Sequence, residues 1–159
     1  MYKRQASVWG IPITAIGSYG DNLLNITNAY SAINNNGKIQ SPKILEKIES
    51  FNKQSIWENR SISKKILDLK INEKINKLLE KSVKEGTSKA ASIKGKKIYG
   101  KTGTSDGNKD LWFIGSIDNL TTGIWIGYDD NKESELSSGN AAYLWRNFIS
   151  EIYKIPIKK

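Results

Sequence analysis

Three strand-like runs in the second half of the chain, the last two of them apolar, are joined by short turn sequences and limit the fold more than any other feature. The runs span residues 98–104, 111–117 and 121–128. The turn sequences Ser105–Asn108 and Asp118–Asn119 are too short to hold a crossover helix, so neighbouring strands must run antiparallel. Apolar side chains occupy both faces, as in the consecutive residues 124–126, and such a sheet needs cover on both sides. The sequence therefore predicts a three-stranded antiparallel meander buried between other elements.

Helices are predicted before and after this meander. Asn22 is placed to cap a helix over residues 23–35. A second helix is expected to start at Asn72, its predicted cap, and to end at Gly86. A third, over residues 141–153, carries an apolar face wide enough to cover the sheet. We therefore expect an α+β fold of the α/β/α sandwich type: helices, then the meander, then a covering C-terminal helix.

The segment between the first two helices is less regular. Residues 44–48 alternate in a way that indicates a short strand, and residues 51–62 are polar and suit a hairpin or a loop. No repeat or long linker divides the 159 residues, so a single domain is expected over residues 1–159. No apolar run reaches the roughly 18 residues that a membrane-spanning helix needs.

The chain contains no cysteine and no histidine. Disulfides, thiol nucleophiles, the usual zinc ligands and every Ser-His catalytic scheme are therefore excluded from these residues. Acid–base chemistry would have to use Lys, Asp, Glu or Tyr. We expect no metal site and no cofactor.

The formal charge of +9 is carried almost entirely by lysine, with arginine only at Arg4, Arg60 and Arg146. A polyanion-binding surface is one interpretation of this charge. The lysines are interleaved with glutamates rather than gathered on one element, and this pattern favours an ordinary solvated surface. We expect no nucleic-acid partner.

The tetrapeptide Lys101-Thr102-Gly103-Thr104 is the strongest candidate for a functional site. An ammonium beside a hydroxyl can hold a carboxylate, and a glycine lets a ligand backbone come close. On a sheet-edge strand such a segment can pair with an extended peptide, and a backbone N–H just past the glycine can face a developing oxyanion. By itself, a short string of this kind in a lysine-rich chain is more often a solvated strand end.

The flanking sequence resembles a known family. Residues 100–105, 108–115 and 122–130 resemble the GKTGT, NKDAWF-G and TGVWVGYDD stretches of the bifunctional (class A) penicillin-binding proteins. Further stretches agree in the same order along the chain: Ile16–Ser18, Asn28–Tyr30 with Asn36–Gly37, Lys84–Ala91 and Ala141–Phe148. The resemblance implies the C-terminal part of a transpeptidase domain, and hence a partial beta-lactamase/transpeptidase-like fold.

The resemblance also implies roles for individual residues. Lys101 would place the substrate carboxylate and set the positive potential, while the Thr102 and Thr104 hydroxyls would bind that carboxylate. Gly103 would give clearance, and the Thr104 N–H would form half of an oxyanion hole, so Lys101 and Thr104 are the expected catalytic residues. Four aromatic residues also match the family and are interpreted mainly as packing: Trp112, Phe113, Trp125 and Tyr128.

The family's chemistry needs a Ser-x-x-Lys and a Ser-x-Asn motif well upstream of the Lys-Thr-Gly strand. Strings that fit occur at Ser50–Lys53, Ser61–Lys64 and Ser138–Asn140, but a nucleophile should begin a buried, apolar helix that desolvates its lysine. These segments do not, so we expect no nucleophile in this chain and the nucleophile-bearing part of the domain to be absent. The strand over residues 121–128 would then keep an unpaired apolar edge, making the chain aggregation-prone or dependent on a partner segment.

The resemblance implies a peptidoglycan D,D-transpeptidase as parent protein, at the periplasmic face of the bacterial inner membrane, with stem peptides ending in D-Ala-D-Ala as substrate and beta-lactams as inhibitors. A glycosyltransferase domain would precede it. The alternatives are a catalytically dead remnant or peptidoglycan-binding module and, ranked last, a basic nucleic-acid-binding domain.

Overall fold

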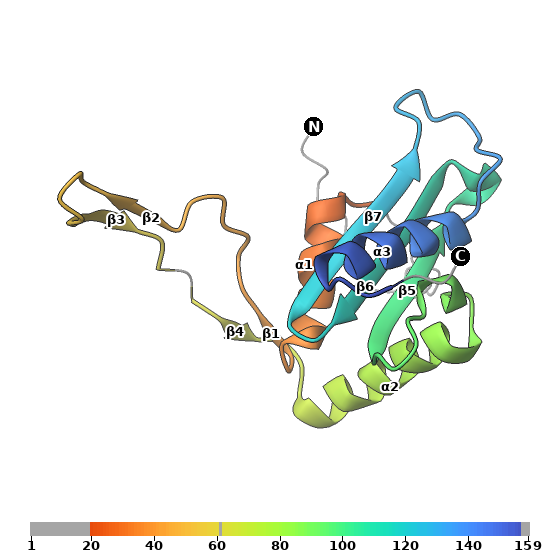
Figure 1. Cartoon of the computed structure of the whole chain (residues 1–159), viewed down its shortest axis with the longest axis horizontal. Helices are drawn as coiled ribbons and strands as arrows, with labels where there is room; N and C mark the ends of the chain where they lie inside the picture. The colour runs from red at the N-terminus through yellow and green to blue at the C-terminus, as the bar shows by residue number, and fades with distance from the viewer. Residues whose placement is uncertain (1–19, 61, 157–159) are drawn as a thin grey trace, which may run out of the picture.

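The computed structural model describes residues 20–60 and 62–156 of the chain. These residues form a body of helices packed on a sheet, with a long hairpin projecting from it (Figure 1). In chain order the elements are α1 (Leu23–Asn34), β1 (Lys38–Ile39), β2 (Lys47–Glu49), β3 (Ser55–Glu58), β4 (Lys64–Lys65), α2 (Leu69–Glu85), the 3-10 turn η2 (Lys89–Ala91), β5 (Ile98–Thr104), the 3-10 turn η3 (Asp106–Asn108), β6 (Asp110–Ile117), β7 (Leu120–Gly127) and α3 (Ser138–Ile152).

The predicted meander is confirmed. Strands β5, β6 and β7 form an antiparallel sheet in that order, with Gly100 opposite Gly115 and Phe113 opposite Ile124. The turn between β6 and β7 contains Asp118 in the left-handed region (φ 49°), a conformation that aspartate tolerates in tight hairpins. Because β6 pairs on both sides, β5 and β7 are the outer strands.

One face of the sheet packs against α3. The rings of Phe113 and Trp145 meet edge to face, 5.3 Å apart, and both side chains are fully buried. Gly115 makes room for this contact, since a Cβ there would lie 2.7 Å from the Trp145 ring. Burial of Trp145 and Phe113, two of the largest side chains in the core, accounts for much of the apolar area that holds α3 to the sheet.

The opposite face is covered by α1 over β6 and β7. A Cβ at Gly123 would lie 2.2 Å from the Thr27 Oγ1 and 2.8 Å from the Leu23 side chain, so the helix approaches β7 closely. The α+β class, with a sheet between helical layers, is therefore confirmed. Within the described ranges, no helix combines the length and apolar character that crossing a membrane requires.

The predicted helix boundaries agree with the structure at the start of α1 and at the end of α2, but not at the start of α2. Asn22 caps α1, since its Oδ1 accepts the N–H of Asn25 at 2.8 Å. The predicted start of α2 is wrong: the helix begins at Leu69, after Asp68, and Asn72 is buried inside it. The Asn72 N–H donates to the Asp68 carbonyl at 2.8 Å, so the helical hydrogen bonds begin one turn before Asn72; Gly86 ends the helix as predicted.

Residues 40–60 and 62–63 form an arm that projects from the body (Figure 1). Its outer part is the β2–β3 hairpin, and β1 pairs with β4 at its base. The strand predicted over residues 44–48 is wrong at its start, because pairing begins only at Lys47, opposite Glu58. The hairpin or loop expected over residues 51–62 corresponds in part to this hairpin, since residues 51–58 supply its turn and its second strand. Phe51 and Ile44 are fully exposed on this arm.

Candidate functional site

Residues Lys101–Thr104 form the second half of β5, an outer strand of the sheet. The strand places them in extended conformation, as the sequence predicted, and not in a helix. Within the described parts of the chain, β6 is the only strand that pairs with β5, so the other side of β5 is an open edge. An extended ligand can therefore reach this backbone.

The backbone groups of Thr102 and Thr104 face the open edge. The Ser105 N–H donates to the Asp110 carbonyl at 3.0 Å, which fixes Ser105 toward β6. Because alternate residues of a strand turn their N–H and C=O groups to the same side, Gly103 also faces β6, and Thr102 and Thr104 face outward. The Lys101 Nζ donates to the outward Thr102 carbonyl at 2.8 Å. The ammonium, the Thr102 carbonyl that it binds and the outward Thr104 N–H thus share one edge.

The side chains divide between the two faces of the sheet. Lys101 and Gly103 lie on the face that α1 covers farther along, whereas Thr102 and Thr104 lie on the face of α3. Lys101 and Thr104 are exposed, but Thr102 is only 7% exposed and its Oγ1 lies 2.8 Å from the Thr87 Oγ1. A Cβ at Gly103 would touch Trp112 at 3.3 Å. The freely reachable side-chain groups are therefore the Lys101 ammonium and the Thr104 hydroxyl.

This candidate site is a strand edge and not a pocket. One surface hollow lies between the end of α1 and the β6–β7 turn, and another lies at the base of the arm near Gln40 and Lys64. Neither contains residues 101–104. The geometry suits a ligand that adds itself to a sheet along its backbone.

Comparison with known proteins decides the family. Residues 10–146 match the family model described as the penicillin binding protein transpeptidase domain. The chain belongs to this family. It is 34% identical to penicillin-binding protein 1A of Rickettsia prowazekii and 28% identical to penicillin-binding protein 4 of Bacillus subtilis, with 87% of this chain covered in each case. It spans only 21% and 23% of the length of these two relatives.

Solved penicillin-binding proteins share the fold. Penicillin-binding protein 1A from Haemophilus influenzae superposes with a TM-score of 0.74 at 18% identity, over 92% of this chain and 28% of that one. Penicillin-binding protein A from M. tuberculosis, solved as an imipenem acyl-enzyme complex, gives a TM-score of 0.71 at 19% identity, over 86% of this chain and 33% of that one. The partial transpeptidase-like fold implied by the sequence is confirmed.

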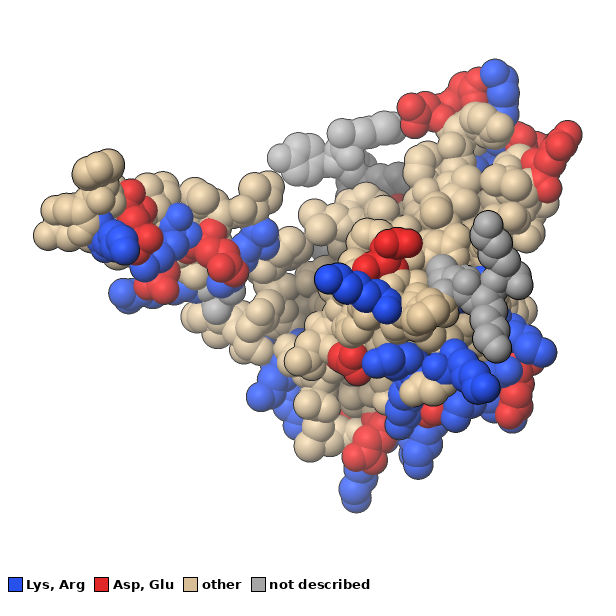
Figure 2. Space-filling view, viewed as in Figure 1, with Lys and Arg blue, Asp and Glu red and all other residues tan. Residues whose placement is uncertain are grey.

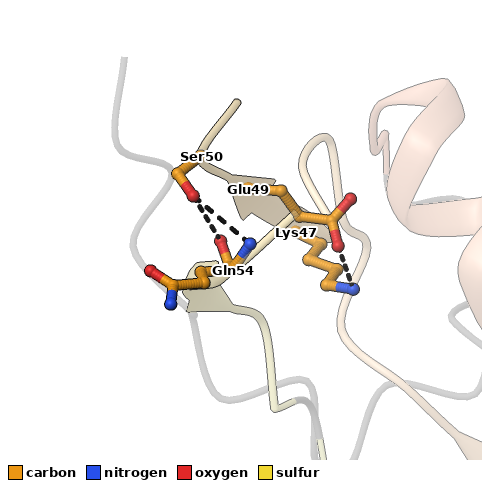
Figure 3. Close-up of polar contacts among 4 residues, drawn as sticks. All are labelled: Lys47, Glu49, Ser50 and Gln54. Carbon is orange, nitrogen blue, oxygen red and sulfur yellow. Dashed lines mark hydrogen bonds and ion pairs between the residues drawn. The ribbon is translucent and has the colours of Figure 1, made fainter. Parts of the chain in front are cut away.

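Ser50, a candidate for the nucleophile of this transpeptidase family, lies in the turn of the arm. Its hydroxyl accepts the N–H of Gln54 at 3.2 Å and lies 3.4 Å from the Gln54 carbonyl, while Lys47 and Glu49 pair alongside (Figure 3). Lys53 is exposed, with positive φ. The hydroxyl thus closes a hairpin turn, and nothing desolvates the lysine that would have to act as its base.

The structure describes the candidate string Ser138–Asn140 in full and the string Ser61–Lys64 only in part. Ser61 lies outside the described residues, and Lys64 is exposed in β4. Ser138 begins α3, and the Asn140 Oδ1 accepts the Ser137 N–H at 2.9 Å, so the Ser-x-Asn string forms a helix cap. None of these groups lies in β5 or in the segment around Thr87 that packs on it.

The matching aromatic residues differ in their surroundings. Phe113 is buried in the core, as the packing interpretation requires. Trp125 is 37% exposed and its Nε1 donates to the Asp110 Oδ1 at 2.9 Å, and Tyr128 is 55% exposed. Trp125 therefore packs only in part, and Tyr128 is mostly in solvent beyond the end of β7.

The charges are more segregated than the sequence indicated. Lys and Arg gather at the lower side of the molecule, and Asp and Glu gather at the upper right (Figure 2). Five lysines of α2 recur at helical spacing along one stripe: Lys70, Lys74, Lys77, Lys81 and Lys84. Lys81 pairs with Glu85 at 3.9 Å, and Lys84 pairs with Glu80 at 2.7 Å. The expectation that lysines do not gather on one element is wrong for α2.

Sequence reasoning gave no role to Thr87, the residue that contacts the candidate site most directly. Thr87 lies within Lys84–Ala91, one of the stretches that resemble the family, so a signal was present. Its contact with Thr102 could not be predicted, because 14 residues lie between the two threonines and only the packing of α2 beside β5 brings them together.

Proposed function

We propose that residues Lys101–Thr104 form the substrate-binding edge of a serine-type D,D-transpeptidase, and that the parent protein cross-links peptidoglycan. The carrying observation is that Lys101 and Thr104 are both exposed, on the two faces of one outer strand, and that the Thr104 N–H points outward between them. The substrate is a stem peptide ending in D-Ala-D-Ala, whose terminal carboxylate is drawn to Lys101. The names of the relatives, penicillin-binding protein 1A among them, support this proposal and its bifunctional class.

The edge positions the peptide for acyl transfer. The stem peptide pairs with β5 as an added strand, while the Thr104 and Thr102 hydroxyls hold the carboxylate. The catalytic serine attacks the carbonyl of the penultimate D-Ala, terminal D-Ala leaves as the free amino acid, and the amine of a second stem then takes the acyl group from the serine. The Thr104 N–H donates to the oxyanion that forms on the attacked carbonyl. Gly103 has no side chain and therefore leaves room for the peptide beside the strand.

The serine comes from a part of the transpeptidase domain other than the described residues. The Ser50 hydroxyl closes a turn, Ser138 is the first residue of α3, and neither lies on β5. The chain covers about a third of a solved relative that was trapped as an imipenem acyl-enzyme, which supports both the need for further residues and beta-lactams as ligands. The site would work at the periplasmic face of the inner membrane, where its substrate is located.

Labelling with a fluorescent penicillin tests the proposal. The chain alone should take no covalent label. The chain should then be co-expressed with a segment of a relative that carries the Ser-x-x-Lys and Ser-x-Asn motifs. That segment should take the label, and Lys101→Ala in this chain should reduce the labelling. Lys94→Ala is the matched control, because Lys94 is an exposed lysine before β5.

Each contrary result has a separate meaning. Label on this chain alone would show that a serine within it is the nucleophile. Equal labelling with and without this chain, or with Lys101→Ala, would disprove the role of β5.

The lysine stripe of α2 supports a second candidate, a non-catalytic module that binds a polyanion. This candidate predicts a DNA mobility shift that weakens steeply with salt and with Lys74→Gln/Lys77→Gln. We rank it second because two lysines of the stripe are paired with glutamates of the same helix.

A further inference from the structure

The segment Gly86–Ser88, between α2 and η2, is held rigidly by α2. The N–H groups of Gly86 and Ser88 both donate to the Ser82 carbonyl, at 3.0 and 3.2 Å. The Ser82 and Ser88 hydroxyls lie 2.8 Å apart, and Ser88 is fully buried. A Cβ at Gly86 would lie 2.9 Å from the Ser82 carbonyl oxygen, so only glycine allows this close return. The middle residue, Thr87, therefore projects from a fixed base.

Thr87 projects onto the centre of the candidate site. Its Oγ1 lies 2.8 Å from the Oγ1 of Thr102, and both groups are partly buried. Thr102 is 7% exposed, so its side chain meets solvent or a ligand only along a narrow strip. In the described part of the chain, this contact is the one hydrogen bond of the Thr102 hydroxyl. Which of the two hydroxyls donates is not fixed by the pair itself.

A carboxylate ligand decides which of the Thr87 and Thr102 hydroxyls donates in this pair. A hydroxyl has one proton and two acceptor lone pairs, and an ionised carboxylate can only accept. When Thr102 donates its proton to a carboxylate, it has none left for Thr87. Thr87 must then donate to the Thr102 Oγ1, and this second hydrogen bond polarises the first in a partly buried site.

We propose that Thr87 is a positioning residue that holds the Thr102 hydroxyl in one rotamer and donates to it when an anionic ligand binds. This inference rests on the proposed function, because it assumes that the ligand of Thr102 is a peptide carboxylate. The carboxylate is then recognised by a chain of two hydroxyls, one from β5 and one from the segment after α2. Without Thr87, the Thr102 oxygen would lack its partner and its χ1 angle would be free to vary.

Three variants of the full chain test this arrangement. Thr87→Val keeps the shape and removes the hydroxyl, whereas Thr87→Ser keeps the hydroxyl. Thr121→Val is the matched control, because it removes another hydroxyl pair, that of Thr121 with Ser116, from β7 and β6 without touching Thr87 or Thr102. Scalar couplings measured by NMR report the χ1 rotamer of Thr102. We expect one rotamer in the unaltered chain, in Thr87→Ser and in Thr121→Val, and averaging in Thr87→Val.

Ligand binding gives the second readout. Titration with N-acetyl-D-alanyl-D-alanine, followed at the Thr102 and Thr104 amides, should show about fivefold weaker binding for Thr87→Val, the size expected for one supporting hydrogen bond. Thr87→Ser should restore binding and Thr121→Val should not change it. Adding Thr87→Val to Thr102→Val should produce no further loss, because the two residues act through one contact.

The outcomes separate this inference from the proposed function. A single Thr102 rotamer and unchanged binding in Thr87→Val would overturn the inference, as would a Thr87→Ser variant that behaves like Thr87→Val. If the unaltered chain ignores the dipeptide while Thr87→Val still frees the Thr102 rotamer, the positioning contact stands and the proposed ligand of the site is wrong.

Discussion

The two outer strands of the same sheet offer different surfaces to a partner. β5 ends in Lys101–Thr104, with a charged group, hydroxyls and a glycine at its open edge. β7 carries Ile124 and Ile126, which pack toward the core, and Trp125, which is 37% exposed on the other face. Among the described residues, neither strand has a second neighbour.

The side chains along an outer strand therefore decide which kind of partner its edge can bind. A polar edge is stable in water and can exchange its water for a ligand, whereas an apolar edge is costly until another strand covers it. β5 is thus suited to reversible contact with a peptide, and β7 to permanent pairing with a strand from elsewhere.

Trp145→Ala should destabilise the sheet that carries both β5 and β7, and so impair the two edges alike. Trp145 is fully buried against Phe113 on the central strand, so truncation should lower the free energy of unfolding by about 3–5 kcal/mol. Chemical denaturation measures the loss. Trp57→Ala on the arm is the control and should cost far less, because Trp57 is 44% exposed. Equal losses would mean that the core does not lie under the sheet as described.

Lys101→Ala should impair β5 alone. Removing the ammonium should weaken binding of N-acetyl-D-alanyl-D-alanine about tenfold, because hydrogen bonds to charged groups contribute about 1.5–3 kcal/mol. Self-association through β7 should not change. Calorimetric titration, with Lys94→Ala as control, measures the first effect. Unaltered binding would place the carboxylate elsewhere.

Trp125→Lys should impair β7 alone. A charge on an exposed strand opposes edge-to-edge pairing, so the tendency of the chain to self-associate should fall several-fold while dipeptide binding stays the same. Sedimentation velocity over a concentration series measures this, with Trp57→Lys on the projecting arm as the matched control. If the unaltered chain is a sharply unfolding monomer at every concentration, the expected apolar edge of β7 is wrong.

Glu80→Gln should produce the smallest effect, a pH-dependent loosening of α2 beside β5. The Glu80 carboxylate pairs with Lys84 at 2.7 Å and with Lys97 at 3.7 Å, and mainly the Lys84 ammonium lowers the pKa of Glu80. Ionised Glu80 is therefore favoured in the folded chain, and its stabilisation is present above the ordinary carboxyl pKa of about 4.3 and is lost as the pH falls through the lower folded pKa.

Thermal unfolding from pH 3 to pH 7 measures this effect. Glu80→Gln should lower the Tm by about 1–2 °C near pH 7 and match the unaltered chain in acid. Glu73→Gln, on the same helix and in no ion pair within the described residues, should show no such convergence. A constant offset at every pH would assign the effect of Glu80 to packing.

Much of the fold followed from local pattern. The strand over residues 98–104, the tight turn at Asp118 and the cap at Asn22 were predicted because their signals depend only on neighbouring residues. The start of α2 was missed because Asn72 fits a cap by composition, and only packing showed that it is buried inside the helix. The start of β2 was missed for the same reason: pairing with β3, not alternation, sets it.

The candidate site divides in the same way. Lys101 to Thr104 were identified from their sequence, and the structure places them on an open edge, while their roles in binding and catalysis stay predictions. The burial of Thr102 under Thr87 could not be predicted, since it depends on the angle at which α2 approaches β5. The stripe of lysines along α2 was misjudged because interleaving along the chain does not mean mixing on the helix surface.

Local sequence was enough to predict the meander, the family and the candidate tetrapeptide of β5, because backbone propensity, turn chemistry and short motifs are properties of adjacent residues. Packing between distant segments sets which hydroxyl is reachable and which lies against Thr87, and it places Ser50 in a turn. Those properties depend on burial and on contacts between distant segments, and a linear pattern carries little record of either.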